Sequence, residues 1–458
     1  MRIFESQHKK DRLIFILIIS FIFIINPLFA QEKEQSKYFI LKNGLKVFLL
    51  EKHKLPLVNL VTAFNVGSKD ESEETSGLVH ILEHYILFRG TEFRTGDEIA
   101  RDIRCHGAYF NAHTGRDIVT IESTLPSEYT EFALQNQKEI SFNLKLIQKE
   151  LDEEKQIILE EINNIHDDPL RYATSLVYQN LFKNHPYQKP VYGKKETIET
   201  LNIETIEKFY KTYFIPSNCA IVLVGDFHIH EIEGKIKKMY GDLENPGYKL
   251  PKYEKVYPLE KSIEIEHEMD VNLAYTVIGM IGPDYNDKDQ YTIDILTEIL
   301  GHGINPLLYT PLRKRRVSPE SLTMDYGTYE HGGAILISLT LDSRNVRIAQ
   351  REILQFLKRL KNFNFSKKDY YGESQFDAFD FLQSAKNRIK LNTYRSQESG
   401  LLTASSLARF MLLNKNKDRG NYLHNVNKVS SSDLRHAAGK YLGIGRYVIV
   451  SIIPKKKK

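Results

Sequence analysis

The alternation of apolar and polar positions predicts strands near the start of the chain and helices further along. Residues 38–51 contain two apolar runs joined by Asn-Gly at 43–44, a dipeptide that readily adopts the positive φ angles of a tight hairpin turn. Another apolar run at 56–66 predicts a further strand. The spacing then changes to the period of a helix at 76–88 and over most of 126–165. The pattern predicts an α+β protein.

Two segments of the chain, which we call closing units, have the same predicted order of elements. Residues 201–227 read as a helix, Tyr213, a short turn and an apolar strand. Residues 429–454 read as a helix, Tyr441, a short turn and an apolar strand. A repeat of this size predicts two homologous halves, each a mixed sheet with helices packed on one face.

The segment between the two halves differs in composition from both of them. Residues 245–257, NPGYKLPKYEKVY, are rich in Pro, Gly and Lys, which is typical of a linker. We therefore expect an N-terminal domain at 31–244, a linker at 245–260 and a C-terminal domain at 261–458.

The first thirty residues have the pattern of a secretory signal peptide. A cationic stretch ends at Arg12, thirteen almost entirely apolar residues follow at Leu13–Ile25, and Pro27 precedes a small residue, Ala30. We expect cleavage after Ala30 and a mature protein that is periplasmic or secreted, with no membrane segment left. An uncleaved membrane anchor is the alternative.

The net charge of +4 does not describe the body of the chain. Residues 1–30 carry a net charge of +2 and the tail Lys455–Lys458 adds +4, which leaves −2 for the remainder. The body therefore lacks the basic surface that is typical of nucleic-acid-binding proteins, and we expect no nucleic-acid partner.

The sequence His-Ile-Leu-Glu-His at 80–84 is the first candidate for chemistry. On a helix, His80 and His84 lie on one face and Glu83 lies near both. Two imidazoles that bind Zn²⁺, with a carboxylate that takes a proton from water, are the groups of the HxxEH metallopeptidase motif. The alternative is a helix with two solvated histidines.

A third ligand is suggested by the helix predicted around 151–165. Its residues Leu151, Glu154, Ile158, Glu161 and Ile165 share one face, and that face should be apolar. An unpaired buried carboxylate is costly, so the two glutamates need partners. A metal would explain one of them, and a hydrogen bond to a metal ligand would explain the other. Alternatively, both belong to a solvated acidic run.

At these residues the chain resembles the insulinase/pitrilysin family of zinc metallopeptidases. It is most similar to the single-subunit-sized branch that includes the mitochondrial processing peptidases. The resemblance covers nearly all of the mature chain. Its motifs are LKNGLKVFLLE, VGSKDE, GLVHILEHYILFRGT, GAYFNAHTGRD, EEKQIILEEINNIHDDP, HPYQKPVYG and VLVGDF.

The resemblance implies a fold and a set of roles. It implies two repeated α/β domains that form half of a clamshell, with zinc in the N-terminal domain. It makes His80, His84 and Glu161 the zinc ligands, Glu83 the general base, and Glu154 a carboxylate behind the ligands.

The resemblance also implies where substrate binds. Asn111 and Ala112 match the edge segment at which a substrate backbone adds as an extended strand. The alternative for these two residues is a polar turn after a strand.

One departure from the family concerns the group that stabilises the transition state. Family members that supply this group themselves carry an Arg and, seven residues later, a Tyr in the C-terminal domain. Here Arg313 is present, but Glu320 occupies the Tyr position, and an ionised carboxylate cannot donate a hydrogen bond to an oxyanion. One alternative is that Tyr326 or Tyr329 takes the role of the missing tyrosine. Another is that Arg313–Arg316 form a solvated helix end without a role.

The sequence therefore predicts a zinc endopeptidase that cleaves peptides or unfolded protein segments bound as an extended strand. Because the Arg and Tyr pair is incomplete, we expect this chain to be the zinc-bearing half of a two-subunit enzyme, with a second family member or a second copy as partner. The rival hypothesis is a non-catalytic assembly or chaperone-like subunit on the same fold.

Overall fold

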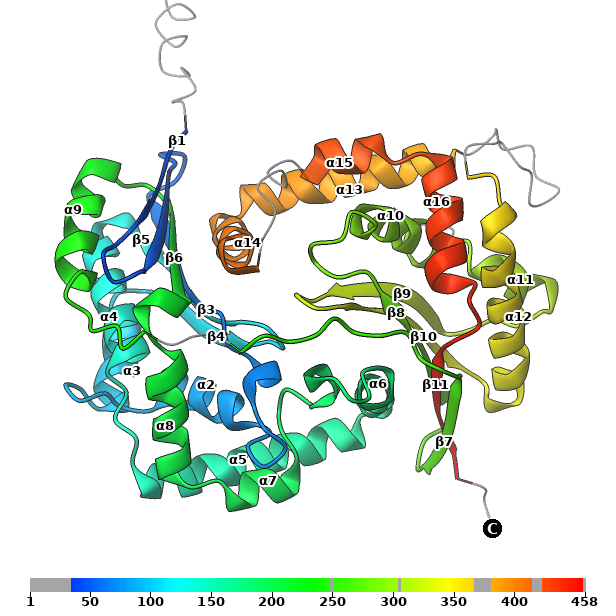
Figure 1. Ribbon diagram of the computed structural model, residues 1–458, viewed down its shortest axis with the longest axis horizontal. Helices are drawn as coiled ribbons and strands as arrows, with labels where there is room; N and C mark the ends of the chain where they lie inside the picture. The colour runs from blue at the N-terminus through cyan, green and yellow to red at the C-terminus, as the bar shows by residue number, and fades with distance from the viewer. Residues whose placement is uncertain (1–33, 248–250, 304–305, 366–379, 414–421, 456–458) are drawn as a thin grey trace, which may run out of the picture.

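Two halves, each with its own β-sheet, make up the computed structural model (Figure 1). It describes residues 34–247, 251–303, 306–365, 380–413 and 422–455. The predicted signal segment lies outside the described residues and stays a prediction, which N-terminal sequencing of the mature protein can decide. Within the described chain, no helix has the length and apolar character needed to cross a membrane.

The first sheet has six strands in the order β1-β2-β6-β3-β5-β4. Only β2 and β6 pair in parallel, and the other neighbours are antiparallel. The predicted hairpin is confirmed, with Gly44 at a φ of 87° in its turn. The strands are β1 (Gln35–Ile40), β2 (Lys46–Glu51), β3 (Leu57–Phe64), β4 (Tyr109–Thr114), β5 (Val119–Pro126) and β6 (Cys219–Gly225).

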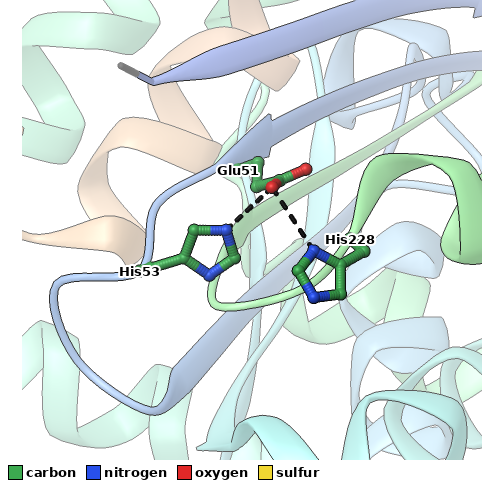
Figure 2. A group of neighbouring side chains, drawn as sticks. All are labelled: Glu51, His53 and His228. Carbon is green, nitrogen blue, oxygen red and sulfur yellow. Dashed lines mark hydrogen bonds and ion pairs between the residues drawn. The ribbon is translucent and has the colours of Figure 1, made fainter. Parts of the chain in front are cut away.

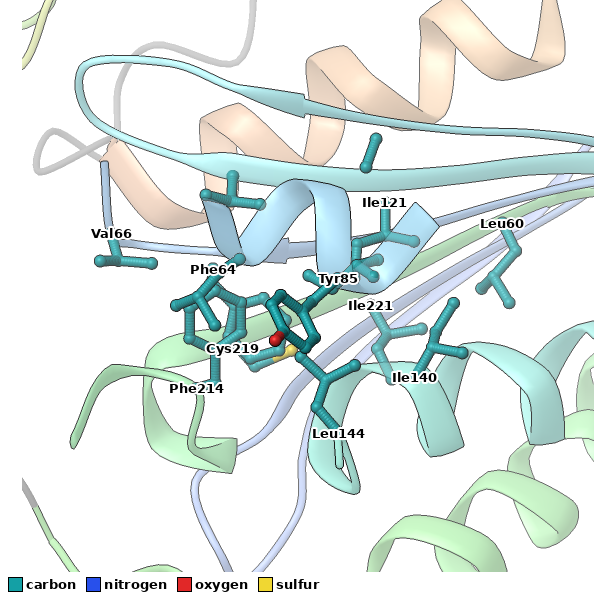
Figure 3. Packing of buried hydrophobic residues seen from close by; sticks show 14 of the residues in the cluster. Leu60, Phe64, Val66, Tyr85, Ile121, Ile140, Leu144, Phe214, Cys219 and Ile221 are labelled. Atoms are coloured by element: carbon teal, nitrogen blue, oxygen red, sulfur yellow. The ribbon is translucent and has the colours of Figure 1, made fainter. Parts of the chain in front are cut away.

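Helices of the first half pack against this sheet and enclose a continuous apolar core (Figure 3). Tyr85 of α2 is fully buried there, and its hydroxyl donates to the carbonyl of Ile147 just before α5. This bond fixes α2 relative to α5. The helices of this part of the chain are α2 (Leu78–Phe88), α3 (Gly96–Cys105), α4 (Thr130–Phe142), α5 (Gln148–Asp167), α6 (Pro169–Leu181), α7 (Lys195–Thr200), α8 (Ile203–Tyr213) and α9 (Ile229–Tyr240).

The second sheet repeats the first without its outermost strand, in the order β7-β11-β8-β10-β9. Its strands are β7 (Ile263–Met269), β8 (Ala274–Gly282), β9 (Ser321–Thr328), β10 (Gly333–Leu341) and β11 (Val448–Pro454). Its helices are α10 (Gln290–Gly301), α11 (Tyr309–Lys314), α12 (Val346–Arg359), α13 (Phe381–Glu398), α14 (Gly400–Leu413), α15 (Tyr422–Lys428) and α16 (Ser431–Ala437).

The closing unit predicted from the sequence occurs in both halves. Strand β6 follows α8 and lies between β2, to which it is parallel, and β3, to which it is antiparallel. Strand β11 follows α16 and lies between β7 and β8 with the same two orientations. The two mixed sheets therefore have the same topology, and the α+β prediction is confirmed.

The expectation that helices cover only one face of each sheet is wrong. Helix α14, from the second half, packs on β6 and β3 of the first sheet, where Ala404 and Ala408 are buried against Val61 and Val222. Conversely, α6 packs on β8 and β11 of the second sheet. Each half thus supplies a helix to the sheet of the other half.

One glycine allows the close approach of α6. A Cβ placed on Gly279 of β8 would lie 2.3 Å from a methyl carbon of Val177, which is far inside van der Waals contact. The absence of a side chain at Gly279 therefore lets α6 lie directly on the second sheet.

Hydrogen bonds also connect the two halves. Asp117, two residues before β5 in the sequence, is buried. Its carboxylate accepts from the Tyr187 hydroxyl at 2.6 Å and from the backbone N–H of Glu330 at 2.9 Å. The Tyr187 hydroxyl in turn accepts from the backbone N–H of His331. The loop between β9 and β10 is therefore anchored to the first half.

His185, beside this network, is held in its neutral form. Its Nδ1 accepts from the backbone N–H of Tyr187, and its Nε2 donates to the carbonyl oxygen of Glu254, both at 3.1 Å. Burial lowers the pKa of His185 from 6.5 to about 4. Protonation of Nδ1 would break the bond from Tyr187.

We predict that His185 makes the protein less stable as the pH falls from about 6.5 to about 4. In this window the unfolded chain takes up a proton that the folded chain does not, which lowers the free energy of unfolding by at most about 1.4 kcal/mol per pH unit. Urea unfolding across this range should give a shallower decline for His185→Asn. Equal slopes for the variant and the wild type would contradict the assignment.

Candidate metal centre

Helix α2 presents His80, Glu83 and His84 from its N-terminal half. The helix begins after Gly77, which has a φ of 97°. The buried carboxylate of Glu71 accepts from the backbone N–H groups of Gly77 and Val79, both at 2.9 Å, and so satisfies two of the free donors at this helix end. The first turn of α2, on which His80 lies, is therefore held firmly in place.

Helix α5 brings the two glutamates that the sequence singled out. Leu151, Glu154 and Ile158 are buried along one face as predicted, and Glu161 is half-buried further along it. Glu154 is only 1% exposed, so the alternative of a solvated acidic run is wrong for this residue.

His80, His84 and Glu161 converge on one point. The Oε2 atom of Glu161 lies 3.0 Å from His80 Nε2 and 3.7 Å from His84 Nε2. One ligand atom from each of the three residues lies within 4.8 Å of the other two. Two imidazoles and one carboxylate at this spacing fit the donor set of a catalytic zinc, which takes three protein ligands and leaves a fourth position open.

Glu154 lies behind the cluster and orients His84. Its Oε2 atom lies 2.7 Å from His84 Nδ1, and its Oε1 atom accepts from Arg89 Nε at 2.6 Å. Burial raises the pKa of Glu154, but the bonds with His84 and Arg89 lower it by more, so this pKa lies below its usual value. A hydrogen bond at Nδ1 leaves Nε2 of His84 free to bind a metal.

Arg89 is a site residue that the sequence reasoning missed. It follows the last residue of α2, and a second nitrogen of its guanidinium donates to Glu153 at 2.9 Å. Arg89 lies after the end of its helix, so it is not part of a helical pattern of polar and apolar residues. Its partner glutamates lie on another helix, so no sequence spacing connects them to it.

Glu83 lies beside His80, with its Oε2 atom 3.4 Å from His80 Nδ1. Burial raises the pKa of Glu83, but the bond with His80 and the charges of His80 and His84 outweigh it, so the pKa lies below its usual value. Burial lowers the pKa of His80, while the carboxylates of Glu161 and Glu83 raise it to about 9. Glu83 is thus an ionised carboxylate next to the point where the three ligands meet.

Asn111 and Ala112 lie on β4, the last strand of the first sheet. Among the described residues β4 pairs only with β5, so its other edge is open. The backbone N–H of Ala112 donates to Asn111 Oδ1 at 2.9 Å, so a side chain of its own strand satisfies a donor that an added strand could use. The alternative of a polar turn is wrong, because both residues are within a strand.

Arg313 does not join the cluster. It lies on α11 in the second half, with its guanidinium carbon 5.7 Å from the centre of the Tyr309 ring. Figure 1 shows α11 and α2 on opposite sides of the molecule. Tyr309 precedes Arg313 by four residues on the same helix.

Glu320 and the two tyrosines considered as substitutes all lie in the second half. Glu320 is exposed and directly precedes β9. The hydroxyl of Tyr326 donates to the carbonyl of Pro283 at 2.7 Å, and the hydroxyl of Tyr329 lies 2.7 Å from that of Tyr178. Both tyrosines are thus engaged in structural contacts within the chain.

Two family profiles match the sequence. Residues 46–195 match the profile described as "Insulinase (Peptidase family M16)", and residues 200–373 match the one described as "Peptidase M16 inactive domain". The first range contains the whole cluster on α2 and α5, whereas the second contains none of it.

Proteins of several organisms are similar to the chain. The chain is 26% identical over 376 residues to an uncharacterised zinc protease of Rickettsia bellii, covering 80% of this chain and 87% of that protein. It is 23% identical over 269 residues to the probable mitochondrial-processing peptidase subunit beta of Arabidopsis thaliana, covering 58% and 50%. Among solved structures, a protease from Helicobacter pylori has a TM-score of 0.84 at 23% identity over 92% of this chain and all of that one, which shows a common fold.

Proposed function

Because the chain belongs to the insulinase family of zinc proteases, peptidase family M16, we propose that it is a zinc endopeptidase for extended peptide segments. The observation that carries this proposal is the convergence of His80, His84 and Glu161, with the ionised Glu83 beside them. The half-clamshell fold agrees with it, since the structural neighbour from Helicobacter pylori is a protease of the same fold.

His80, His84 and Glu161 are the residues that would hold Zn²⁺. The ion would supply polarisation of the scissile carbonyl and a lower pKa for the attacking water. Glu154 and Arg89 hold the His84 ring through its Nδ1 side, which would leave Nε2 for the ion.

Glu83 moves the protons of the reaction. Its carboxylate accepts a proton from the attacking water as the water oxygen bonds to the carbonyl carbon. It then gives this proton to the leaving nitrogen when the C–N bond breaks. The ionised carboxylate is the form that this first transfer needs.

We propose that substrate adds as a strand to the open edge of β4. An extended segment would take the Ala112 N–H from Asn111 Oδ1 and gain main-chain hydrogen bonds along the edge. Such binding favours unfolded segments over folded proteins, because the substrate backbone has to be free of other pairing.

A partner subunit completes the site in this proposal. Arg313 belongs to α11, which Figure 1 shows on the opposite side of the molecule from α2, and Glu320 stands where the family has tyrosine. The chain therefore offers no Arg and Tyr pair to its own cluster. The relative from Arabidopsis thaliana is named as a subunit beta. A second family member that carries the pair would supply the oxyanion donors.

Mixing experiments test this division of labour. By itself, the chain should cleave a fluorogenic unstructured peptide slowly. The partner to add is a homologue from the same organism that lacks the two histidines and carries the Arg and Tyr pair. With this partner, cleavage should be at least about 100-fold faster, because one oxyanion donor contributes about 10²- to 10³-fold. Full activity of the isolated chain as a monomer would contradict the need for a partner. Full activity as a dimer of this chain would identify a second copy as the partner.

A non-catalytic subunit is the second candidate function. The description "inactive domain" for residues 200–373 and the glutamate at position 320 favour it. The retained cluster on α2 and α5 favours the enzyme. Metal analysis separates the two, since a protein that binds no zinc on α2 and α5 would support the non-catalytic subunit.

A further inference from the structure

A second cluster of potential metal ligands lies where β2 ends and α9 begins. Glu51 is the last residue of β2, His53 follows it in the loop to β3, and His228 directly precedes α9. One ligand atom from each of these residues lies within 4.8 Å of the other two. Figure 2 shows the Glu51 carboxylate between the two imidazole rings. This cluster shares no residue with the one on α2 and α5.

The carboxylate of Glu51 is oriented by the backbone. Its Oε2 atom accepts from the N–H of Ile229 at 2.9 Å, at the first turn of α9. Its Oε1 atom faces both rings, 2.7 Å from His53 Nε2 and 3.6 Å from His228 Nδ1. One oxygen thus holds the position of the group, and the other is directed at the two imidazoles.

The ring of His53 is oriented by a second carboxylate. Its Nδ1 atom lies 2.6 Å from Asp226 Oδ1, and the other oxygen of Asp226 accepts from the Ser127 hydroxyl at 3.0 Å. A carboxylate that accepts a hydrogen bond from Nδ1–H leaves Nε2 of the neutral imidazole as a ligand, which is the usual arrangement behind a metal-binding histidine. Glu154 stands in the same relation to His84 in the first cluster.

We propose that Glu51, His53 and His228 bind a second divalent transition metal of the zinc class. Two imidazoles and one carboxylate are ligands that zinc accepts, and the closely spaced donors need only small side-chain rotations to surround an ion. The His228 side chain is 69% exposed, which leaves room for water at a fourth position. The ion would join the β2–β3 loop to the turn between β6 and α9.

The competing explanation is an ion pair without metal. A protonated His53 between Glu51 and Asp226 would satisfy both carboxylates. His228, whose side chain is 69% exposed and whose Nδ1 lies 3.6 Å from Glu51 Oε1, would then be solvated by water. The two explanations differ in whether zinc binds.

The test uses the full chain without an affinity tag and with His80→Asn and His84→Asn, so that only the second cluster can bind strongly. After metal removal, titration with Zn²⁺ in a calorimeter should show one ion per chain, and Co²⁺ should give the visible absorption of a low-symmetry site. Adding His53→Asn and His228→Asn should abolish both signals. His230→Asn, which changes a nearby exposed histidine outside the cluster, should leave them unchanged.

Two results would overturn the proposal. One is no zinc binding by the chain with His80 and His84 replaced, and the other is binding that survives the loss of His53 and His228. If the multiple variant does not fold, the single exposed change His228→Asn in the otherwise wild-type chain decides: zinc content should fall by one ion per chain. The first experiment removes the two histidines of the first cluster, and the second compares zinc content with and without His228. Failure of the proposed peptidase function therefore does not affect either outcome.

Discussion

Replacing Glu83 with glutamine should lower the rate of peptide cleavage by about 10²- to 10⁴-fold, the usual contribution of a general base. The amide has nearly the shape of the carboxylate but cannot accept the proton of the attacking water. The structure places Glu83 beside His80 rather than among the three converging ligand atoms. The expected effect is therefore on kcat, with little change in zinc content.

Kinetics and metal analysis of Glu83→Gln have to be made together. The rate should be measured under the conditions in which the wild-type chain is active, alone or with its partner, and zinc should be counted in the same preparation. Full activity would rule out Glu83 as the base. Loss of zinc along with activity would instead show that Glu83 helps to hold the metal.

Replacing Glu161 with glutamine should have the second largest effect, through the metal itself. An amide oxygen is neutral and binds zinc far more weakly than a carboxylate. Because changes to groups behind the ligands already cost about 10- to 100-fold in affinity, loss of a ligand should cost more than about 100-fold. Competition with a chelator of known zinc affinity measures this change, and cleavage should fall in parallel at limiting zinc.

The neighbouring residue provides a matched control for this variant. Glu160 has the same chemistry and belongs to the same helix, but it is exposed and is not part of the cluster. Glu160→Gln should therefore bind zinc and cleave peptide as the wild type does. Equal zinc affinities for the two variants would contradict the role of Glu161 as a ligand.

The sequence predicts well those helices and strands in which apolar residues recur at a short, regular spacing. The helix of His80 and His84 follows from apolar spacing over 76–88, and the buried face of α5 follows from steps of three and four residues. The interruption of that face by Glu154 and Glu161 identified both glutamates, because carboxylates on an apolar face need partners.

The exchange of helices between the halves had no such signal. An apolar face on α6 or α14 predicts burial, but periodicity does not say which sheet covers it. The close approach depends on Gly279, and an isolated glycine in a strand has several explanations. The sequence therefore predicted each half but not how each completes the other.

The second cluster shows another limit of sequence reasoning. Glu51 and His53 are two residues apart at the end of a strand, and Asp226 and His228 are two residues apart after another strand. Neither pair forms a recognisable motif alone. Their meeting depends on the parallel pairing of β2 with β6, in which Glu51 lies opposite Gly225.

The most direct test of the account is the zinc dependence of peptide cleavage by a metal-stripped chain in which His53→Asn and His228→Asn remove the second cluster. With the partner present, cleavage should be absent without metal, rise in proportion to added Zn²⁺ and reach its maximum at one ion per chain. Cleavage at the full rate without metal, or none by the zinc-loaded mixture, would contradict the assignment of His80, His84 and Glu161 as the catalytic metal centre.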